Sequence, residues 1–392
     1  MLAVAGRLLA CALSTSAMAQ LPAGYITTAF PNPTSQGTGL LTARVYYPAL
    51  STGFNAPLRP LAGGYPVIVF LHGYGGIGSF YSVLGKMFAE AGYVAVLSDT
   101  AQFSASTQVL DGSALFPALR NANNQTGNFL EGALDMSRAG VCGHSMGGGS
   151  TINVLLHNPG YAAGFCFAPV SASSAAVRVP LGVVHGTGDT TLAWATTGQA
   201  VYQQAANYTG MKFFYLLDNS CNHTNVAGLS LNSQTSLAVW DRCAAIAIGF
   251  FGRFLDDKPN GLEEIIGPTG RAEPRLTQVS VEVETPDIWQ VGAAAIGQST
   301  RISMVAEPGR ALIFVAAGTD SVPTPFGTLL LDPATLSVVQ SGTIAADQLL
   351  STTLPVPNMP ALIGAKVYLQ AAGATPNAAI RLGTRLELTI VP

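Results

Sequence analysis

The sequence predicts an α/β domain followed by a smaller all-β domain, and three observations lead to this fold class. Residues 20–255 alternate strand-like apolar runs with segments of helical periodicity, which indicates a mostly parallel sheet covered by helices. Residues 270–392 carry strand patterns only, with the alternation of apolar and polar residues that is typical of a β-sandwich. A segment rich in Pro, Gly and charge separates the two parts, as a linker does. The expected organisation is an α/β domain at 20–258, a linker at 259–270 and a β-sandwich-like accessory domain at 271–392.

Each expected element follows from its local pattern. The run PVIVFL at 66–71 has the length and continuous apolar character of a buried parallel strand. Apolar residues recur at helical spacing between Ser79, which can cap a helix, and Gly92, which can end it. Further strands are expected at 43–47, 93–97, 139–142, 164–168, 182–185 and 213–217, and further helices near 109–122, 151–157 and 237–255. In the second part, strands are expected at 279–283, 310–316, 327–331 and 385–390.

The composition excludes several classes of protein. The chain has 392 residues, enough for two domains. Hydrophobic residues make up 48% and charged residues 10%, which excludes disorder as the main state. The formal net charge of −3 provides no basic excess, so we expect no nucleic-acid partner.

The N-terminus resembles an export signal. Arg7 precedes a short apolar stretch, and small residues ending in Ala17-Met18-Ala19 form an A-x-A cleavage site. A lipoprotein signal ending at Cys11 is a weaker alternative, because its apolar stretch would be very short. No later run reaches about 18 uninterrupted apolar residues, so no membrane span is expected. We therefore expect a signal peptide at 1–19 and a secreted protein, extracellular or periplasmic.

The segment Gly143-His144-Ser145-Met146-Gly147 matches the pattern G-x-S-x-G, in which a strand turns sharply into a helix and exposes a serine nucleophile. It follows an expected strand and precedes an expected helix, which is the context that this chemistry needs. The alternatives are a plain glycine turn and a phosphate-binding loop. A phosphate loop would carry a lysine after the glycines, where Ser150 and Thr151 stand instead.

A serine nucleophile needs a base, and the base needs an orienting acid. In sheets with this turn the chain order is serine, acid, histidine. His223, in a polar loop after a strand, is the only histidine beyond Asp189. Asp189 follows the expected strand at 182–185 and is preferred as the acid over Asp218, which lies only five residues before His223.

Two backbone N–H groups are expected to form an oxyanion hole. Met146, the residue after the nucleophile, supplies one. The loop His72-Gly73-Tyr74-Gly75-Gly76 after an early strand supplies the other, with Tyr74 as the donor and its ring as a wall of the substrate cleft. The alternative for this loop is a simple glycine turn.

Four cysteines follow the expected signal peptide. Cys142 and Cys166 lie in apolar runs and are expected to be buried thiols, whereas Cys221 and Cys243 are expected to form a disulfide bond. The alternatives are a bridge between Cys142 and Cys166 and four free thiols. No cluster of Cys and His has metal-ligand spacing, so we expect neither a metal nor a cofactor.

Residues 40–255 resemble the bacterial polyester hydrolases, that is, cutinase-like and poly(ethylene terephthalate) hydrolase-like enzymes of the α/β-hydrolase superfamily. The resemblance is carried by 65–74 (YPVIVFLHGY), 91–100 (AGYVAVLSDT) and above all 134–149 (LDMSRAGVCGHSMGGG). It implies Ser145, Asp189 and His223 as a catalytic triad. One position departs from the family: Val170, which the resemblance places in the substrate cleft, follows Ala-Pro where these enzymes usually carry a tryptophan. Trp194 is a candidate replacement, although a packing role is the simpler interpretation.

The resemblance implies a secreted serine hydrolase that cleaves polyester or cutin-like esters, including poly(ethylene terephthalate), through an acyl-enzyme. The alternatives are a short-chain carboxylesterase, lipase-like or acetylhydrolase-like enzyme without polymer activity, and a non-catalytic binding or adhesion protein. We expect a monomer. The C-terminal domain lies outside the resemblance, and we expect it either to bind polymer or the cell surface or to stabilise the enzyme.

Overall fold

The computed structural model describes residues 20–31, 39–100, 103–345, 349–374 and 380–392. The expected signal peptide at 1–19 lies outside the described residues. No helix in the described ranges is long and apolar enough to cross a membrane.

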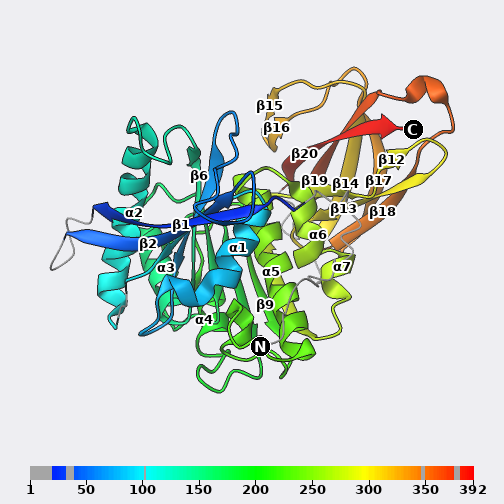
Figure 1. Ribbon diagram of the computed structural model, residues 1–392. Helices are drawn as coiled ribbons and strands as arrows, with labels where there is room; N and C mark the ends of the chain where they lie inside the picture. The colour runs from blue at the N-terminus through cyan, green and yellow to red at the C-terminus, as the bar shows by residue number, and fades with distance from the viewer. Residues whose placement is uncertain (1–19, 32–38, 101–102, 346–348, 375–379) are drawn as a thin grey trace.

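A sheet lies at the centre of the α/β part (Figure 1). Among the described residues it has ten strands, in the order β10-β9-β8-β7-β6-β4-β5-β2-β1-β3. Its strands are β1 (Ala23–Pro31), β2 (Leu40–Pro48), β3 (Gly53–Phe54), β4 (Tyr65–Leu71), β5 (Val94–Ser98), β6 (Leu134–His144), β7 (Ala163–Phe167), β8 (Leu181–Gly186), β9 (Met211–Leu217) and β10 (Leu276–Val283). The six strands from β5 through β4, β6, β7 and β8 to β9 are parallel to one another. Their carboxyl ends therefore meet along one edge of the sheet, where ligands bind in open α/β sheets.

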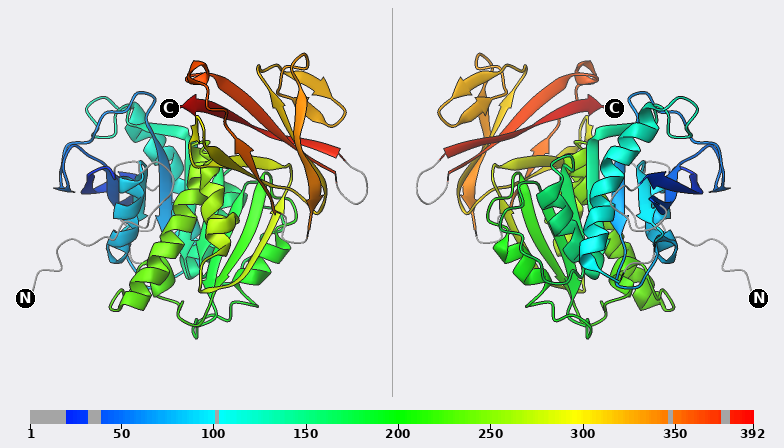
Figure 2. Two further views of the ribbon diagram at one scale, coloured as in Figure 1. Left: turned by 90° about the vertical axis from the view of Figure 1, so that its right-hand side faces the viewer. Right: turned by 90° about the vertical axis from the view of Figure 1, so that its left-hand side faces the viewer.

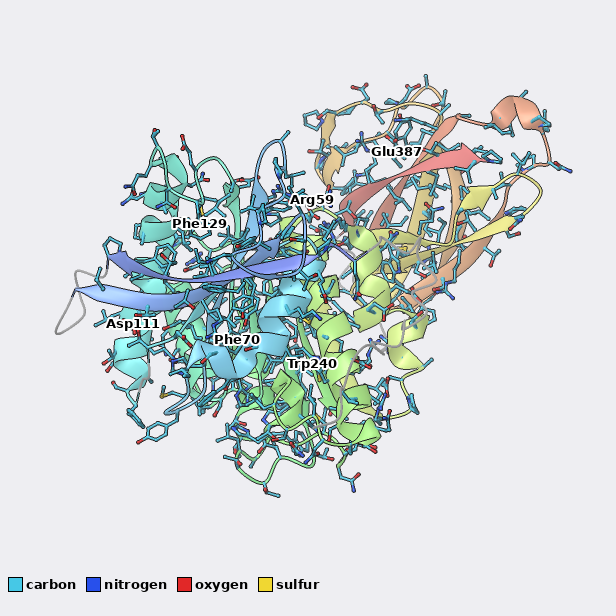
Figure 3. The ribbon with its side chains drawn as sticks, in the orientation of Figure 1. Arg59, Phe70, Asp111, Phe129, Trp240 and Glu387 are labelled. Carbon is cyan, nitrogen blue, oxygen red and sulfur yellow. The ribbon has the colours of Figure 1, made fainter. Side chains whose placement is uncertain are left out.

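Helices cover both faces of this sheet. They are α1 (Ser82–Glu90), α2 (Ala105–Asn124), α3 (Met146–His157), α4 (Gly198–Gln204) and α5 (Gln234–Leu255), with the short helices η1 (Gly78–Tyr81) and η2 (Asn225–Ala227). Side chains of α1 and α5 pack into one apolar cluster, and side chains of α2 pack into a second cluster on the opposite face. Phe70 of β4 and Trp240 of α5, both labelled in Figure 3, belong to the first cluster. All seven residues of β4, and all seven of β9, are buried, because both faces of these strands are covered.

The C-terminal strands form three smaller sheets. They are β11 (Asp287–Val291), β12 (Ala294–Ala295), β13 (Ser299–Val305), β14 (Gly309–Ala316), β15 (Val322–Thr324), β16 (Gly327–Leu329), β17 (Ser337–Ile344), β18 (Leu349–Pro355), β19 (Lys366–Ala374) and β20 (Ile380–Val391), with η4 (Pro360–Leu362). The sheets have the orders β11-β13-β18, β12-β20-β19-β14-β17 and β15-β16. The first two enclose a common apolar cluster to which Ile302 and Met304 contribute from one sheet and Ile313 and Leu369 from the other. Figure 2 shows these strands beside the α/β part.

The first strand expected in the accessory domain has a different place. β10 pairs antiparallel with β9 and forms the edge of the central sheet, so an accessory domain that begins at residue 271 would include a strand of the α/β sheet. The reason is apolar burial: Val281 and Val283 pack into the cluster that contains side chains of α1 and α5, here called the main cluster, and Trp289 from β11 joins them. A local strand pattern cannot reveal this, because alternation predicts a strand but not its neighbour.

The expected linker at 259–270 is also structured. It forms η3 (Pro259–Gly261), α6 (Leu262–Ile265) and α7 (Pro268–Arg271). Leu262, Ile265 and Ile266 are fully buried in the main cluster. The two parts of the chain are therefore joined by packed structure.

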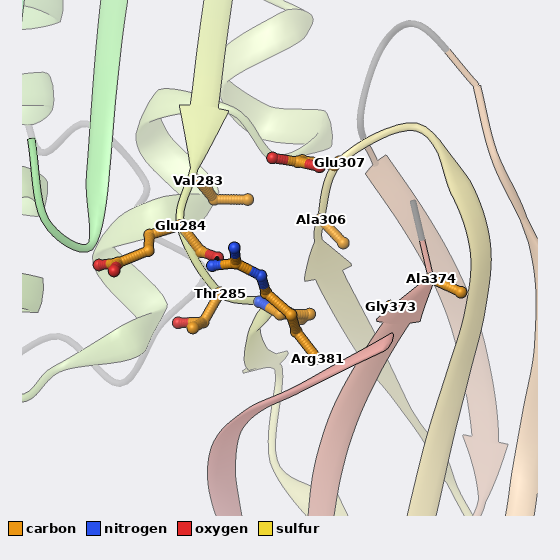
Figure 4. A pocket seen from close by; sticks show the side chains of 9 residues that line it. Val283, Glu284, Thr285, Ala306, Glu307, Gly373, Ala374 and Arg381 are labelled. Atoms are coloured by element: carbon orange, nitrogen blue, oxygen red, sulfur yellow. Dashed lines mark hydrogen bonds between the residues drawn. The ribbon is translucent and has the colours of Figure 1, made fainter. Parts of the chain in front are cut away.

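A small pocket lies where the turn after β10 meets the C-terminal strands (Figure 4). Arg381 lines it and donates a 2.8 Å hydrogen bond to the carbonyl oxygen of Glu284. Val283, which also lines it, pairs with Met211 at the start of β9. The pocket is therefore at the amino end of the parallel strands, opposite the edge where the expected site residues gather.

Candidate active site

Ser145 lies at the sharp turn between β6 and α3, with φ 56° and ψ −119°. A non-glycine residue in this region is strained, by about 1–3 kcal/mol, and such strain is concentrated at functional sites. The glycines on either side make the turn possible. A Cβ on Gly143 would collide with the carbonyl of Gly147, and one on Gly147 would collide with that of Leu71. The two glycines of the G-x-S-x-G pattern are thus required because neighbouring backbone segments approach too closely for any side chain.

His223 lies between the expected nucleophile and the expected acid. Its Nε2 is 2.9 Å from Ser145 Oγ, and its Nδ1 is 2.7 Å from Asp189 Oδ2. Asp189 Oδ1 accepts hydrogen bonds of 2.8 Å from the backbone N–H groups of Thr191 and Leu192. The carboxylate is therefore held in one orientation, and one of its oxygens faces the imidazole.

The surroundings of Asp189 favour its ionised form. Burial by itself raises the pKa of this carboxyl group, but the hydrogen bonds from His223 and from the Leu192 N–H, together with the charge of His223, outweigh burial and lower the pKa. When Asp189 is ionised, Nδ1 of His223 carries a hydrogen and donates it to the carboxylate. Nε2 is then free to accept the proton of Ser145.

Asp218, the alternative acid, has a local structural role. Its carboxylate accepts hydrogen bonds from the backbone N–H and the hydroxyl group of Ser220, at 2.9 and 2.5 Å. The side chain thus shapes the 218–224 loop that carries His223, while Asp189 makes the contact with the imidazole.

The two expected oxyanion donors belong to segments that border Ser145. Met146 is the first residue of α3, so its N–H has no partner within the helix and lies at the positive end of the helix dipole. The 72–76 loop approaches from the other side: a Cβ on Gly73 would be 3.5 Å from the Cβ of Ser145. Tyr74 follows directly, with its side chain 69% exposed.

Besides Tyr74, two further residues were expected in the cleft, and their surroundings differ. Val170 lies beside the nucleophile, and its N–H donates a 3.0 Å hydrogen bond to the carbonyl oxygen of Ser145. Trp194 is partly buried against a core cluster and stacks on Phe214, with ring centroids 6.4 Å apart. This contact indicates a packing role for Trp194.

Sequence reasoning missed an aromatic residue at the rim of the site. Phe103 is 65% exposed, and its ring meets that of Tyr74 edge to face, with centroids 5.3 Å apart. It packs over Gly75, where a Cβ would be 2.8 Å from the ring. The available signal was a lone aromatic residue in the polar segment that follows a parallel strand.

Two buried histidines lie next to the candidate triad. His144 Nε2 is 2.7 Å from the carbonyl oxygen of His223. His185 Nε2 is 3.8 Å from Asp189 Oδ2. Burial is the main cause that lowers the pKa of both imidazoles, to about 3 for His144.

The expected disulfide bond is absent. Cys221 and Cys243, like Cys142 and Cys166, are free, buried thiols. The interaction with the Cys243 thiol, and then burial, raise the pKa of the Cys221 thiol. Both belong to the main apolar cluster, where a thiol packs as a small hydrophobic side chain and needs no bridge. In the described ranges no group of three His, Cys, Asp or Glu side chains could hold a metal ion.

Comparison with known proteins gives consistent matches. A family model described as PET hydrolase-like matches residues 12–266. A bis(hydroxyethyl) terephthalate hydrolase of Streptomyces coelicolor is 27% identical over 247 residues, which cover 61% of this chain and 69% of that protein. Cutinase 1 of Thermobifida cellulosilytica and a cutinase of Thermobifida fusca are each 26% identical over 162 residues. These cover 40% of this chain, and 56% and 49% of the two cutinases, so the chain spans about half the length of each.

Proposed function

This chain belongs to the PET hydrolase-like family, and on that premise we propose that it is a secreted serine hydrolase of carboxylic esters. The observation that carries the proposal is the hydrogen-bonded series from Ser145 Oγ through His223 to Asp189. It is supported by the strained backbone of Ser145 at the start of α3.

In the proposed mechanism, Ser145 Oγ attacks the ester carbonyl carbon while His223 Nε2 takes the hydroxyl proton. The N–H groups of Tyr74 and Met146 stabilise the negative charge that develops on the carbonyl oxygen. His223 then gives its proton to the leaving alcohol, and an acyl-enzyme remains on Ser145. Water, activated by His223, releases the acid, and Asp189 holds the imidazole through both steps.

We further propose that the substrates are bulky or polymeric esters. The rings of Tyr74 and Phe103 present exposed apolar area at the loop that borders the nucleophile, as expected for contact with a large substrate. The segment 168–180, which follows β7 next to the site, contains no helix that could cover it. A relative is named for a terephthalate ester and two are named cutinases, so aromatic and aliphatic polyesters are both candidates.

The remaining parts of the chain have proposed roles of their own. Residues 1–19 are proposed to direct export. The sheets that follow β10 are proposed to form a sandwich-like accessory unit that adsorbs to polymer or to the cell surface. Because β10 belongs to the central sheet, this unit would begin near β11.

The test compares the purified protein with Ser145→Ala on two substrates: p-nitrophenyl esters of increasing acyl length, and a polyester film from which soluble products are measured. The proposal expects the wild-type protein to release product from both and the variant to release none. Turnover of the short esters alone would indicate a short-chain carboxylesterase, and turnover of neither would indicate a binding protein.

A further inference from the structure

His144 makes two hydrogen bonds that the proposed mechanism does not use. Its Nε2 is 2.7 Å from the backbone carbonyl oxygen of His223, and its Nδ1 is 2.8 Å from the hydroxyl oxygen of Tyr81. The side chain is buried, and its ring is 4.7 Å from that of His223. His144 also directly precedes Ser145, so it is joined to the nucleophile by the peptide bond.

Only one neutral tautomer of His144 satisfies both contacts. A carbonyl oxygen can only accept, so Nε2 carries a hydrogen and donates it to His223. In a neutral imidazole Nδ1 then accepts, which fits the hydroxyl group of Tyr81 as donor. Burial first, and then the nearby charge of His223, lower the pKa of His144 to about 3, so it stays neutral at the pH of ester hydrolysis.

Tyr81 extends the connection to the 72–76 loop. Its hydroxyl oxygen accepts a 3.1 Å hydrogen bond from the N–H of Gly73, the residue before the expected oxyanion donor Tyr74. The Tyr81 side chain is buried against Phe70, with ring centroids 4.6 Å apart, so the hydroxyl group has a fixed position. The series runs from the His223 carbonyl oxygen through the His144 ring and the Tyr81 hydroxyl group to the Gly73 N–H, and each of these polar atoms has a partner. A buried hydrogen-bond network makes its surroundings rigid when all of its members are paired.

We propose that His144 is a positioning residue that fixes the distances between three backbone segments. These are the turn at 143–147, the 218–224 loop, which it holds through the carbonyl oxygen of His223, and the 72–76 loop, which it holds through Tyr81 and Gly73. The inference rests on the proposed function, since the spacing matters for the transfer of a proton from Ser145 to His223. The 218–224 loop lies outside the helices and strands, and hydrogen bonds such as those to Asp218 and Asn222 hold its own turns. The contact through the His223 carbonyl oxygen ties this loop to the residue before the nucleophile, which limits how far the imidazole can move relative to Ser145. A displacement of about 1 Å at a reacting group can cost about 100-fold in rate.

The test uses His144→Leu, His144→Gln, Tyr81→Phe and the double variant His144→Leu/Tyr81→Phe, with His157→Leu on the exposed side of α3 as the matched control. For each, kcat and KM on a soluble p-nitrophenyl ester, the rate at which a fluorophosphonate labels Ser145, and Tm are measured. We expect His144→Leu to lower kcat and the labelling rate about 10- to 100-fold with KM nearly unchanged. We expect His144→Gln, whose amide keeps a donor and an acceptor, to recover most of that loss.

Tyr81→Phe removes one hydroxyl group and keeps the packed ring, so it tests the connection even where His144→Leu folds poorly. We expect Tyr81→Phe to lower kcat. We expect the loss of kcat in the double variant to be smaller than the product of the two single losses, because both residues act through one series of hydrogen bonds.

The inference is overturned if His144→Leu retains the kcat of the wild-type protein, if His144→Gln is as impaired as His144→Leu, or if the two substitutions act independently. A failure of the proposed function gives a different result: the wild-type protein then neither hydrolyses esters nor reacts with the fluorophosphonate.

Discussion

The indole Nε1–H of Trp289 in β11 donates a 2.9 Å hydrogen bond to Glu263 Oε2 in α6. Trp289 is fully buried, and the other carboxylate oxygen of Glu263 accepts from Arg301 of β13 and from Thr269. A buried carboxylate is stable only when it is paired and hydrogen-bonded, so this contact depends on residues from both parts of the chain. The C-terminal strands are therefore anchored in the core of the α/β part.

This contact gives a stability prediction. Trp289→Ala should lower the free energy of unfolding by about 3–5 kcal/mol, because it opens a cavity in the main core and removes the indole partner of Glu263 Oε2. Trp289→Phe keeps most of the bulk and should cost less. Thermal and urea unfolding check both values, and equal stability of the alanine variant and the wild-type protein would contradict the packing. The kcat of folded protein should not change in either variant.

A second prediction concerns the nucleophile. Ser145→Ala should lower kcat on soluble esters by about a million-fold while leaving Tm nearly unchanged, as the loss of a triad serine does elsewhere. A fluorophosphonate should add its mass to Ser145 of the wild-type protein and to no residue of the variant. Labelling of the variant at another serine would assign the nucleophile elsewhere.

A third prediction separates the two candidate acids. Asp189→Asn should lower kcat by about 10,000-fold, because an amide favours the wrong tautomer of His223. Asp218→Asn is the matched control, since Asp218 bonds to Ser220 rather than to the imidazole, and it should stay within about threefold of the wild-type rate. The reverse order of the two effects would make Asp218 the acid.

The lowered pKa of Asp189 gives a fourth prediction, on pH and stability. Because the pKa is lower in the folded chain than in the unfolded one, the ionised carboxylate stabilises the fold above its unfolded pKa of about 3.9. That contribution is lost as the pH falls through the folded pKa. The difference in Tm between the wild-type protein and Asp189→Asn should therefore shrink on acidification below about pH 4. A constant difference would mean that the pKa is not lowered.

The rim aromatics give a fifth prediction. Phe103→Ala should lower kcat/KM about 2- to 10-fold for esters with large aromatic acyl groups and leave acetate esters nearly unchanged, because one aromatic contact is worth about 0.5–1.5 kcal/mol. Phe54→Ala is the matched control: Phe54 is equally exposed but lies in β3 at the far edge of the sheet. Equal losses for large and small esters would remove Phe103 from substrate binding.

Much of the site could be predicted because its signals are local. The turn at Ser145 brings backbone segments so close together that only glycine fits on either side of it. The G-x-S-x-G pattern therefore predicts the strained backbone that the structure shows. Ser145, Asp189 and His223 follow β6, β8 and β9, and these parallel strands all end at the same edge of the sheet. The structure brings these three side chains into hydrogen-bond contact.

The sequence by itself determined the alternation of strands and helices, the serine turn and the candidate triad, since each depends on periodicity or on residues a few positions apart. Only the tertiary structure decided the rest. It placed β10 on the central sheet rather than with the later strands, because pairing depends on which sheet edge is open and apolar. It brought His144 to Tyr81, 63 residues away, and left Cys221 and Cys243 as thiols, because contacts between distant segments follow from how the whole core packs.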